Sequence, residues 1–473
     1  MKLTIIGAGP GGYSAAFAAA KAGAEVTLVE RAKLGGTCLH TGCIPTKTLR
    51  SSADALDMAS RLAEFGVAGE CSLRADMPAV VTRKRKVTAT LQTGLEKTCA
   101  ALKVRVIRGT AELVNAGLVR VRTAEGVEDV AGDNVILATG SSPLELPALP
   151  VDHVRVLSSD DALELQAVPA SLIIVGGGVI GCELAFIYRA FGSKVTVVEG
   201  QARLLPLPSV DEEISRLMQR EMKKRGIAVE LARTVTAVRP AGDDASGTGV
   251  SVEIGASPFV QAANPPAPRR LEAEAVCVAV GRVPHTDGLN LAAAGVKTDA
   301  RGWIEADDFL ETSVPGVYAI ADILGPRRIM LAHMAVAEAH TAVRNILRPQ
   351  DRKTQRYDVV PSAVFTAPEI GEVGLSEAQA RERGLAVKTA VFQFRELGKA
   401  QAMGALAGLF KIVAEEGTGR LLGVHVAGAH ASDLIAEAAL ALQKGCTAAE
   451  LYETIHAHPT LSEGLYEAAG MLA

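Results

Sequence analysis

The sequence predicts an α/β protein with two similar doubly wound units, followed by a C-terminal α+β module. A pattern of strand, glycine turn, helix and strand begins near the N-terminus and recurs once, with Gly7 and Gly176 169 positions apart. From Tyr357 onward the pattern changes to strands, at 390–394 and 409–413, and then to amphipathic helices. The 473 residues, 48% of them hydrophobic, are enough for about three domains.

The first unit combines an apolar strand, a tight glycine turn, an alanine-rich helix and a second strand that ends in an acid. These features lie at 3–6, at Gly7, Gly9 and Gly12, at 13–21, and at 26–30, with the acid at Glu30. Glycines let the backbone approach a pyrophosphate, the helix N-terminus supplies unpaired N–H groups, and the acid accepts from a ribose hydroxyl. The unit is therefore predicted to be Rossmann-like and to bind a dinucleotide.

The second unit repeats every one of these features. It has strands at 171–175 and 195–199, glycines at Gly176, Gly178 and Gly181, a helix through 190, and the acid Glu199. One such glycine pattern also occurs in ordinary loops, but two complete units are a specific indication of two dinucleotide sites. The carboxylate of Glu199 would repel a 2′-phosphate and favours NAD over NADP, although the nearby Arg203 leaves NADP open.

Two cysteines, Cys38 and Cys43, follow the first unit closely. In a regular helix their Cα atoms would lie about 8.7 Å apart, whereas a disulfide needs about 4.4 to 6.8 Å, so the helix must be distorted, which Gly42 could permit. A bridge that closes so short a loop adds little stability, and a redox-active pair is the favoured interpretation. Two buried free thiols, or half of a zinc site, are the alternatives.

The order of these features along the chain indicates which cofactor each unit binds. Nicotinamide transfers hydride, thiols exchange through thiolates, and a flavin can mediate between the two. Because the cysteine pair follows the first unit, we expect FAD in the first unit and NAD in the second.

Charge and composition exclude several classes of function. The formal net charge is −4 with acids and bases interspersed, so a nucleic-acid partner has little electrostatic support. No apolar run approaches the length of a membrane span. Met1 and Lys2 lead straight into the first strand without a targeting peptide, and cytoplasmic residence is the expectation.

Several motifs together resemble the flavin-dependent disulfide oxidoreductases of class I, and most closely their dihydrolipoamide dehydrogenase branch, over nearly the whole chain. These motifs are the GGTCLHTGCIPTK segment at 35–47, ATG at 138–140, the second glycine pattern, GR at 281–282, PGVYAIAD at 315–322 and HAHPTLSE at 456–463. The resemblance implies that residues 1–143 and 282–347 form a discontinuous FAD domain, 144–281 an NAD domain and 348–473 a dimerisation domain. It also implies a homodimer in which each active site is shared between the two subunits.

The same resemblance implies roles for individual residues. Asp322 would bind the ribityl chain of FAD, Lys47 would lie near the flavin and pair with Glu183, and Gly281 would close the nicotinamide site. Further contacts with the flavin would come from Ala111, Thr139, Gly140, Met330, Leu331, Ala332 and His333. No metal is implied.

His458 and Glu463 would act on Cys38 and Cys43 of the other subunit. His458, oriented by Glu463, would deprotonate a substrate dithiol, because the thiolate is the attacking species. Cys38 would be the sulfur that is attacked, and Cys43 the thiolate next to the flavin. Outside this motif, the spacing of His456 and His458 would also suit a loop histidine or a metal site.

The implied activity is the oxidation of protein-bound dihydrolipoamide with NAD⁺, as a component of 2-oxo acid dehydrogenase or glycine cleavage systems. Glutathione-type reductases are the alternative, but they would want a basic residue where Glu199 stands. Mercuric reductase would bring a second cysteine pair near the C-terminus, and a transhydrogenase would lack the disulfide. A purely structural role is disfavoured by the intact catalytic residues. One departure from the family is Ala321, where glycine is usual.

Overall fold

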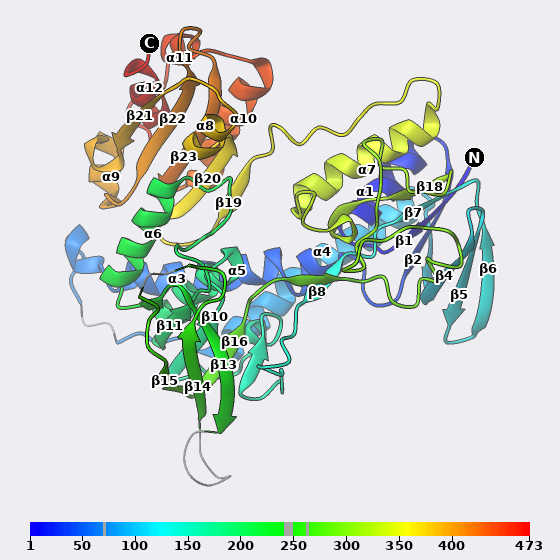
Figure 1. Cartoon of the computed structure of the whole chain (residues 1–473), viewed down its shortest axis with the longest axis horizontal. Helices are drawn as coiled ribbons and strands as arrows, with labels where there is room; N and C mark the ends of the chain where they lie inside the picture. Colours follow the sequence, from blue (N-terminus) through cyan, green and yellow to red (C-terminus); the bar gives the residue numbers. More distant parts are fainter. Residues whose placement is uncertain (70–71, 241–248, 262–263) are drawn as a thin grey trace. The chain divides into compact units, whose positions relative to one another are not determined.

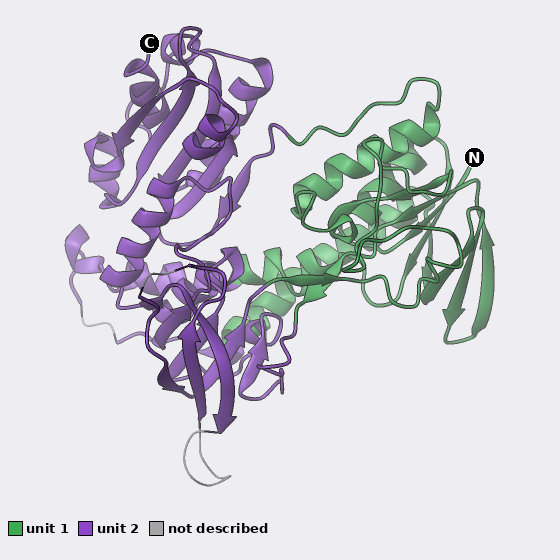
Figure 2. Ribbon diagram, viewed as in Figure 1, with its two compact units in different colours: residues 1–48, 79–144, 281–357 green, residues 49–78, 145–280, 358–473 purple. Residues whose placement is uncertain are grey.

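The computed structural model describes residues 1–69, 72–240, 249–261 and 264–473. These residues form two compact units, coloured separately in Figure 2. Unit 1 comprises residues 1–48, 79–144 and 281–357, and unit 2 comprises 49–78, 145–280 and 358–473. Each unit is therefore assembled from segments that are far apart in the sequence.

Unit 1 is built on a five-stranded parallel sheet with the strand order β18-β7-β1-β2-β3 (Figure 1). Its strands are β1 (Lys2–Ile6), β2 (Glu25–Glu30), β3 (Arg105–Arg108), β7 (Asn134–Leu137) and β18 (Val317–Ala319). Because parallel strands are covered on both faces, they read as continuous apolar runs. In β1, every residue after Lys2 is buried.

Helices and smaller sheets complete unit 1. They are α1 (Pro10–Lys21), α2 (Gly36–His40), the start of α3 (Cys43–Ala59), most of α4 (Met77–Ala101), α7 (Ala332–Leu347), the meander β4 (Thr110–Asn115), β5 (Leu118–Thr123) and β6 (Gly126–Ala131), the pair β8 (Ser141–Pro143) and β17 (Arg282–Pro284), and the 3₁₀ turn η3 (Ala321–Leu324). Helix α1 begins at Pro10, a residue whose fixed φ suits a first helical position. The helices α1 and α7 pack against each other.

Unit 2 contains a second five-stranded parallel sheet, with the order β12-β11-β10-β16-β9. Its elements are β9 (Val156–Ser158), the 3₁₀ turn η2 (Asp161–Leu163), β10 (Ser171–Val175), α5 (Val179–Phe191), β11 (Lys194–Val198), α6 (Glu212–Lys224), β12 (Ala228–Glu230) and β16 (Ala275–Val278). The predicted strand 195–199 ends one residue early, so Glu199 lies just beyond β11, whereas Glu30 is the last residue of β2.

The segment between β12 and β16 in the sequence forms an antiparallel sheet of its own. It contains β13 (Arg233–Pro240), β14 (Val250–Ala256) and β15 (Arg269–Ala273). Residues 241–248 and 262–263 of this segment lie outside the described part of the chain.

The C-terminal module is an antiparallel sheet with the order β19-β20-β23-β22-β21, flanked by helices (Figure 1). Its elements are β19 (Ser362–Val364), β20 (Glu369–Gly374), α8 (Glu377–Glu382), β21 (Val387–Gln393), the 3₁₀ turn η4 (Phe394–Glu396), α9 (Gly398–Met403), β22 (Leu409–Glu415), β23 (Leu421–Gly428), α10 (Ala431–Lys444), α11 (Ala448–Glu453) and α12 (Glu463–Gly470). A short turn, η1 (Leu62–Phe65), also belongs to unit 2. Helix α10 packs on β20 and β23, and α12 on β21 and β22.

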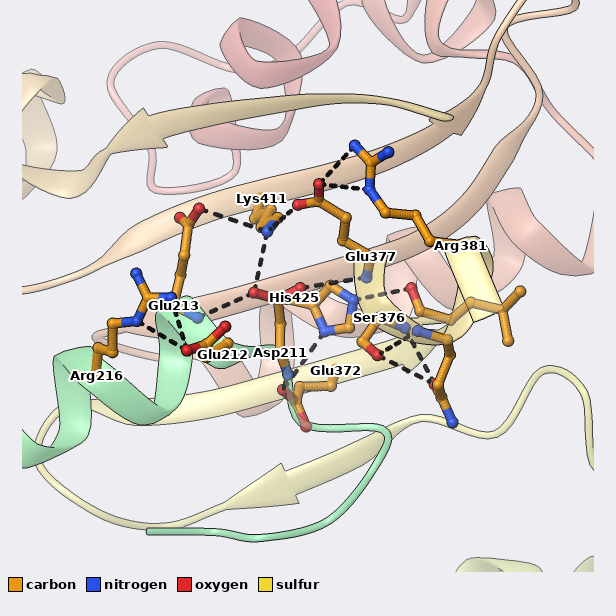
Figure 3. Close-up of polar contacts among 12 residues, drawn as sticks. Asp211, Glu212, Glu213, Arg216, Glu372, Ser376, Glu377, Arg381, Lys411 and His425 are labelled. Carbon is orange, nitrogen blue, oxygen red and sulfur yellow. Dashed lines mark hydrogen bonds and ion pairs between the residues drawn. The ribbon is translucent and has the colours of Figure 1, made fainter. Parts of the chain in front are cut away.

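A buried polar network joins helix α6 to this C-terminal sheet within unit 2 (Figure 3). The ammonium of Lys411, only 3% exposed, lies 3.0 Å from Asp211 Oδ1 and 2.8 Å from Glu377 Oε2. Burial lowers the pKa of Lys411, but the carboxylates of Glu377 and Asp211 outweigh burial and raise it. Nδ1 of His425, which is fully buried, lies 3.4 Å from Oε1 of Glu372. A buried cation thus holds together carboxylates from separate elements.

These findings confirm the predicted fold class, including the change of architecture near Tyr357. The domain boundaries 1–143 with 282–347, 144–281 and 348–473 stay a prediction. Among the described residues, no helix is long and apolar enough to cross a lipid bilayer.

Candidate active site

The first glycine turn is so tight that a side chain would not fit at two of its positions. A Cβ atom on Gly7 would lie 2.3 Å from the carbonyl oxygen of Ala138, and one on Gly12 would lie 1.8 Å from that of Gly7. Gly7 also has a φ of +100°, which favours glycine. The second glycine, Gly9, precedes helix α1, and the N-terminus of that helix has no side-chain cap. Its first N–H groups are therefore available to an anion.

The acid that ends the first unit braces this turn. The carboxylate of Glu30 accepts the backbone N–H of Ala8 at 2.8 Å through Oε2 and that of Ala32 at 2.7 Å through Oε1. Each carboxylate oxygen can accept more than one hydrogen bond. Glu30 can therefore hold the loop and still receive ribose hydroxyls.

The cysteine pair lies at a break between two helices of this unit. Helix α2 ends at His40 and α3 begins at Cys43, so the distortion predicted from the spacing is present. Gly42 does not adopt a left-handed φ; a Cβ there would lie 3.0 Å from the carbonyl oxygen of Thr37, so it is space that favours glycine. Gly36 has a φ of +57° and lies so close to Gly9 of the first glycine turn that a Cβ on Gly36 would come within 2.7 Å of the Gly9 Cα.

Cys38 and Cys43 are in side-chain contact and partly buried. The hydrogen bond to Cys43 is the largest influence raising the pKa of the Cys38 thiol, burial raises it further, and the ammonium of Lys47 opposes both. The two sulfurs are therefore close enough to share a proton and to titrate as a pair.

Asp322 belongs to a small polar cluster in unit 1. Its Oδ2 accepts the hydroxyl of Ser141 at 2.6 Å, and the Nε atom of Arg282 lies 3.8 Å away. Arg282 also donates to the Ser141 hydroxyl at 2.6 Å and to the Ser141 carbonyl at 2.7 Å. The carboxylate is thus held in a defined orientation, without being saturated by its protein partners.

The other residues predicted around the flavin also belong to unit 1. Thr139 donates its hydroxyl to the carbonyl of His285 at 2.7 Å, and Gly140 has a φ of +72°. Ala111 is buried on β4. The remaining predicted residues lie on α3, at Lys47, and at the start of α7, at Met330, Leu331, Ala332 and His333.

The second glycine turn repeats the geometry of the first in unit 2. A Cβ on Gly181 would lie 1.9 Å from the carbonyl oxygen of Gly176, and Gly178 precedes helix α5, which has no side-chain cap. Glu199 accepts the N–H of Gly177 at 2.6 Å and that of Gln201 at 2.7 Å. A Cβ on Gly178 would meet nothing within 4 Å, so the space in front of the helix is open.

Three further residues from the sequence analysis, Arg203, Glu183 and Gly281, are described only within their own units. Arg203 donates to the carbonyl of Leu207 at 2.7 Å, so its guanidinium is engaged within its own loop. Buried Glu183 accepts the N–H of Phe365 at 2.9 Å. Gly281 has a φ of +140°. The predicted pairing of Lys47 with Glu183 joins residues of different units and stays a prediction.

His458 and Glu463 form a direct pair at the start of helix α12. Nδ1 of His458 lies 2.8 Å from Glu463 Oε1, while Glu463 Oε2 accepts the N–H of Thr460 at 2.8 Å. The Thr460 N–H, followed by His458, lowers the pKa of Glu463, so the carboxylate stays ionised. Because a carboxylate only accepts, Nδ1 carries the proton and Nε2 keeps a free lone pair that can act as a base.

The position of this pair is fixed by close packing behind it. Gly464 follows Glu463, and a Cβ there would lie 2.1 Å from the ring of Phe410 on β22, so only glycine lets α12 approach the sheet this closely. The side chain of His458 is itself 78% exposed. Large apolar side chains on the same module, among them Ile455 at 96% and Leu440 at 59%, are exposed too. An exposed apolar surface of this kind is typical of a protein interface.

The residues of both glycine turns fit dinucleotides. Each turn offers uncapped helix N–H groups and an acid that braces the loop while keeping acceptor capacity. In unit 1, this arrangement lies beside the cysteine pair, as a flavin would require. Within the described residues, no three histidine, cysteine or carboxylate side chains gather as metal ligands.

Some residues of the site were not found from the sequence. The phenol of Tyr13 has a raised pKa, owing first to burial and then to the charges of Cys38 and Cys43, so this ring lies near the dithiol. Its position directly after the third glycine is the only indication that the sequence holds. Ser141 and Glu338, which contact Asp322 and Ala321, carry no such indication.

The comparisons with known proteins agree with this geometry. The sequence pattern described as pyridine nucleotide-disulphide oxidoreductase matches residues 1–339, and that of the dimerisation domain of these proteins matches 360–469. The chain is 40% identical over 468 residues to a dihydrolipoyl dehydrogenase of Chlorobaculum parvum. The aligned region covers 99% of this chain and 96% of the relative. It is 38% identical over 466 residues to that of Geobacillus stearothermophilus, with 98% and 94% covered.

Solved structures give the same result for the fold. LpdA from Mycobacterium tuberculosis superposes with a TM-score of 0.89 at 28% identity, over the full length of both chains. RclA from Escherichia coli, a flavoprotein disulfide reductase induced by HOCl, superposes with a TM-score of 0.85 at 27% identity, again over both full lengths.

Proposed function

The chain belongs to the pyridine nucleotide-disulphide oxidoreductases, and we propose that it oxidises protein-bound dihydrolipoyl groups to lipoyl groups while it reduces NAD⁺ to NADH. The single observation that carries the chemistry is the contact between Cys38 and Cys43 beside the first glycine turn. The choice of the dithiol rests on the relatives named above. They favour it over the alternative, reduction of another disulfide substrate with a nicotinamide cofactor.

The dithiol step can be written with the residues of this chain. Nε2 of His458 takes the proton of one substrate thiol, and the thiolate attacks Sγ of Cys38. In the oxidised enzyme Cys38 and Cys43 would be joined as a disulfide. The attack forms a substrate–Cys38 disulfide, the Cys38–Cys43 bond breaks, and Cys43 leaves as a thiolate. His458 releases the first proton to solvent and takes the proton of the second substrate thiol. The resulting thiolate displaces Cys38, which takes up that proton from His458. The substrate leaves as a cyclic disulfide, and the cysteine pair holds two electrons.

FAD and NAD complete the reaction. Bound FAD would accept the electron pair from the cysteines and pass it to NAD⁺ as hydride. Gly7, Gly9, Gly12, Glu30 and Asp322 would hold FAD, and Gly176, Gly178, Gly181 and Glu199 would hold NAD. Arg203 donates to the carbonyl of Leu207 within its own loop, which supports NAD over NADP.

The protein is a homodimer through its dimerisation domain. His458 and Glu463 of one subunit would act on Cys38 and Cys43 of the other, which the exposure of the histidine supports. Residues 1–143 with 282–347 would form the FAD domain, 144–281 the NAD domain and 348–473 the interface domain. The substrates would be lipoyl-carrying proteins of 2-oxo acid dehydrogenase or glycine cleavage systems, in the cytoplasm.

The direct test is the reduction of NAD⁺ by dihydrolipoamide, followed through NADH absorbance, with purified protein that has been loaded with FAD. Oxidised glutathione with NADH or NADPH serves as the comparison. Rapid NADH formation with dihydrolipoamide supports the proposal. Activity on glutathione alone would assign the enzyme to the alternative, and no activity in either assay would contradict both.

A further inference from the structure

The turn that precedes Asp322 is strained. Ala321 has a φ of +67°, a left-handed conformation that glycine adopts freely and alanine does not. It is the first residue of η3, and its methyl group faces helix α1, where a Cβ on Gly11 would lie 3.2 Å from it. Such a conformation persists only where the surroundings enforce it.

A buried carboxylate contacts this turn. Oε2 of Glu338, on helix α7, accepts the backbone N–H of Ala321 at 2.6 Å. The side chain of Glu338 is 1% exposed. Its other oxygen, Oε1, accepts the hydroxyl of Tyr357 at 2.8 Å, and the guanidinium of Arg328 lies over the Tyr357 ring at 4.8 Å from its centroid. Both carboxylate oxygens therefore have protein partners.

The buried position disfavours the ionised form of the Glu338 side chain. Burial raises its pKa to about 7, although the Ala321 N–H, Tyr357 and Arg328 all lower it, and the nearby charge of Asp322 adds to the rise. Buried carboxylates are costly unless they are well paired. Glu338 is nevertheless buried here, where it accepts the Ala321 N–H and the Tyr357 hydroxyl. Its presence therefore indicates that the position of the turn matters.

The residue that the turn presents is Asp322, which is held from its other side by Ser141. We propose that Glu338 is a positioning residue of the flavin site, which holds the left-handed turn at Ala321 and thereby fixes where Asp322 presents its carboxylate. The inference rests on the proposed function only in that Asp322 binds FAD. It does not depend on which dithiol the enzyme oxidises.

The experiment compares three variants of the holoenzyme. Glu338→Met keeps the size of the side chain but removes the acceptor. Tyr357→Phe removes the other hydrogen bond of the same carboxylate and leaves the Ala321 contact in place. In the double variant Ala321→Gly with Glu338→Met, glycine can form the turn without help. The readouts are the flavin-to-protein ratio, the rate of FAD release into an ultrafiltrate, and the melting temperature.

We expect E338M to release FAD on the order of tenfold faster, since a buried N–H loses its partner. Y357F should stay close to the wild-type rate, and A321G in the E338M background should return close to it. FAD release from E338M at the wild-type rate would overturn the proposal. So would equal losses in E338M and Y357F, because the carboxylate would then act through general stability.

If E338M alone does not fold, the double variant A321G with E338M provides the test. Recovery of a folded protein that retains FAD supports the proposal, and continued failure overturns it. A wild-type protein that binds FAD but does not oxidise dihydrolipoamide would contradict only the proposed substrate. A wild-type protein that binds no FAD would contradict both.

Discussion

At the scale of single residues, four carboxylates differ in role because their surroundings differ. Glu30 and Glu199 each accept two backbone N–H groups and brace a glycine turn. Glu463 is partly exposed and orients His458. Glu338 is fully enclosed and holds a strained turn. The same side-chain chemistry would thus serve binding, catalysis and positioning.

The base assigned to the dithiol step is tested by His458→Gln. Glutamine cannot take up the substrate proton, so we expect kcat with dihydrolipoamide to fall by about 10²- to 10⁴-fold. The flavin absorbance of the purified variant should match that of the wild type. His153→Gln, at another exposed histidine, is the control. Turnover of H458Q near the wild-type value would remove His458 from the mechanism.

The buried carboxylate of Glu338 predicts a particular pH dependence of stability. Its pKa is about 7 in the folded protein, against an ordinary value of 4.5. Between these values the folded state keeps a proton that the unfolded state has lost, so the free energy of unfolding falls as pH rises through this window.

The corresponding measurement is a series of melting curves between pH 5 and pH 8. Glu338→Gln cannot titrate, so the melting temperature of the wild type should fall relative to that of E338Q as pH increases. A difference between the two proteins that is constant across this range would show that Glu338 does not titrate there.

At the scale of elements, the repeated glycine turn is the best-defined feature, and Glu199 makes its specificity testable. Glu199→Gln keeps one acceptor oxygen but removes the charge that would repel a 2′-phosphate. We expect kcat/KM for NAD⁺ to fall about tenfold and the discrimination against NADP⁺ to weaken. Glu272→Gln on β15, an exposed acid, is the control. Unchanged cofactor preference in E199Q would contradict this role for Glu199.

The buried ion pairs of Lys411 link α6 to the C-terminal sheet and predict a large stability effect. Lys411→Met leaves the buried carboxylate of Asp211 without its cation, while Glu377 keeps Arg381, so the free energy of unfolding should fall by about 3 to 5 kcal/mol. The measurement is thermal or denaturant unfolding. Lys388→Met on the neighbouring strand, where the side chain is exposed, should change stability little. Equal stability of the two variants would show that the network contributes nothing.

The sequence predicted those elements in which local pattern and packing agree. The strands and helices around Gly7 and Gly176 follow from apolar runs and glycine spacing, and His458 with Glu463 from a short motif. What it could not predict depends on contacts between distant segments. The left-handed φ of Ala321 is indicated only by the glycine that is usual there in the family, and the group that accepts its N–H, Glu338, lies on another element. Lys411 likewise meets Asp211, 200 positions away, only once the chain has folded.

At the scale of the whole molecule, the residues proposed to be catalytic are divided between the two units. The cysteine pair belongs to unit 1, and His458 with Glu463 belongs to unit 2. The exposed histidine, the exposed apolar residues near it and the dimerisation domain all agree with a site completed by a second subunit. We therefore expect the cysteines of one subunit to work with the partner subunit's His458.

Hybrid dimers test this claim most directly. Cys38→Ser and His458→Gln subunits, each carrying a different tag, are co-expressed, and the mixed dimer is purified. One of its two sites would then contain both substitutions and the other neither, so we expect about half of the wild-type activity with dihydrolipoamide. Activity no higher than that of the two inactive parents would contradict a shared active site.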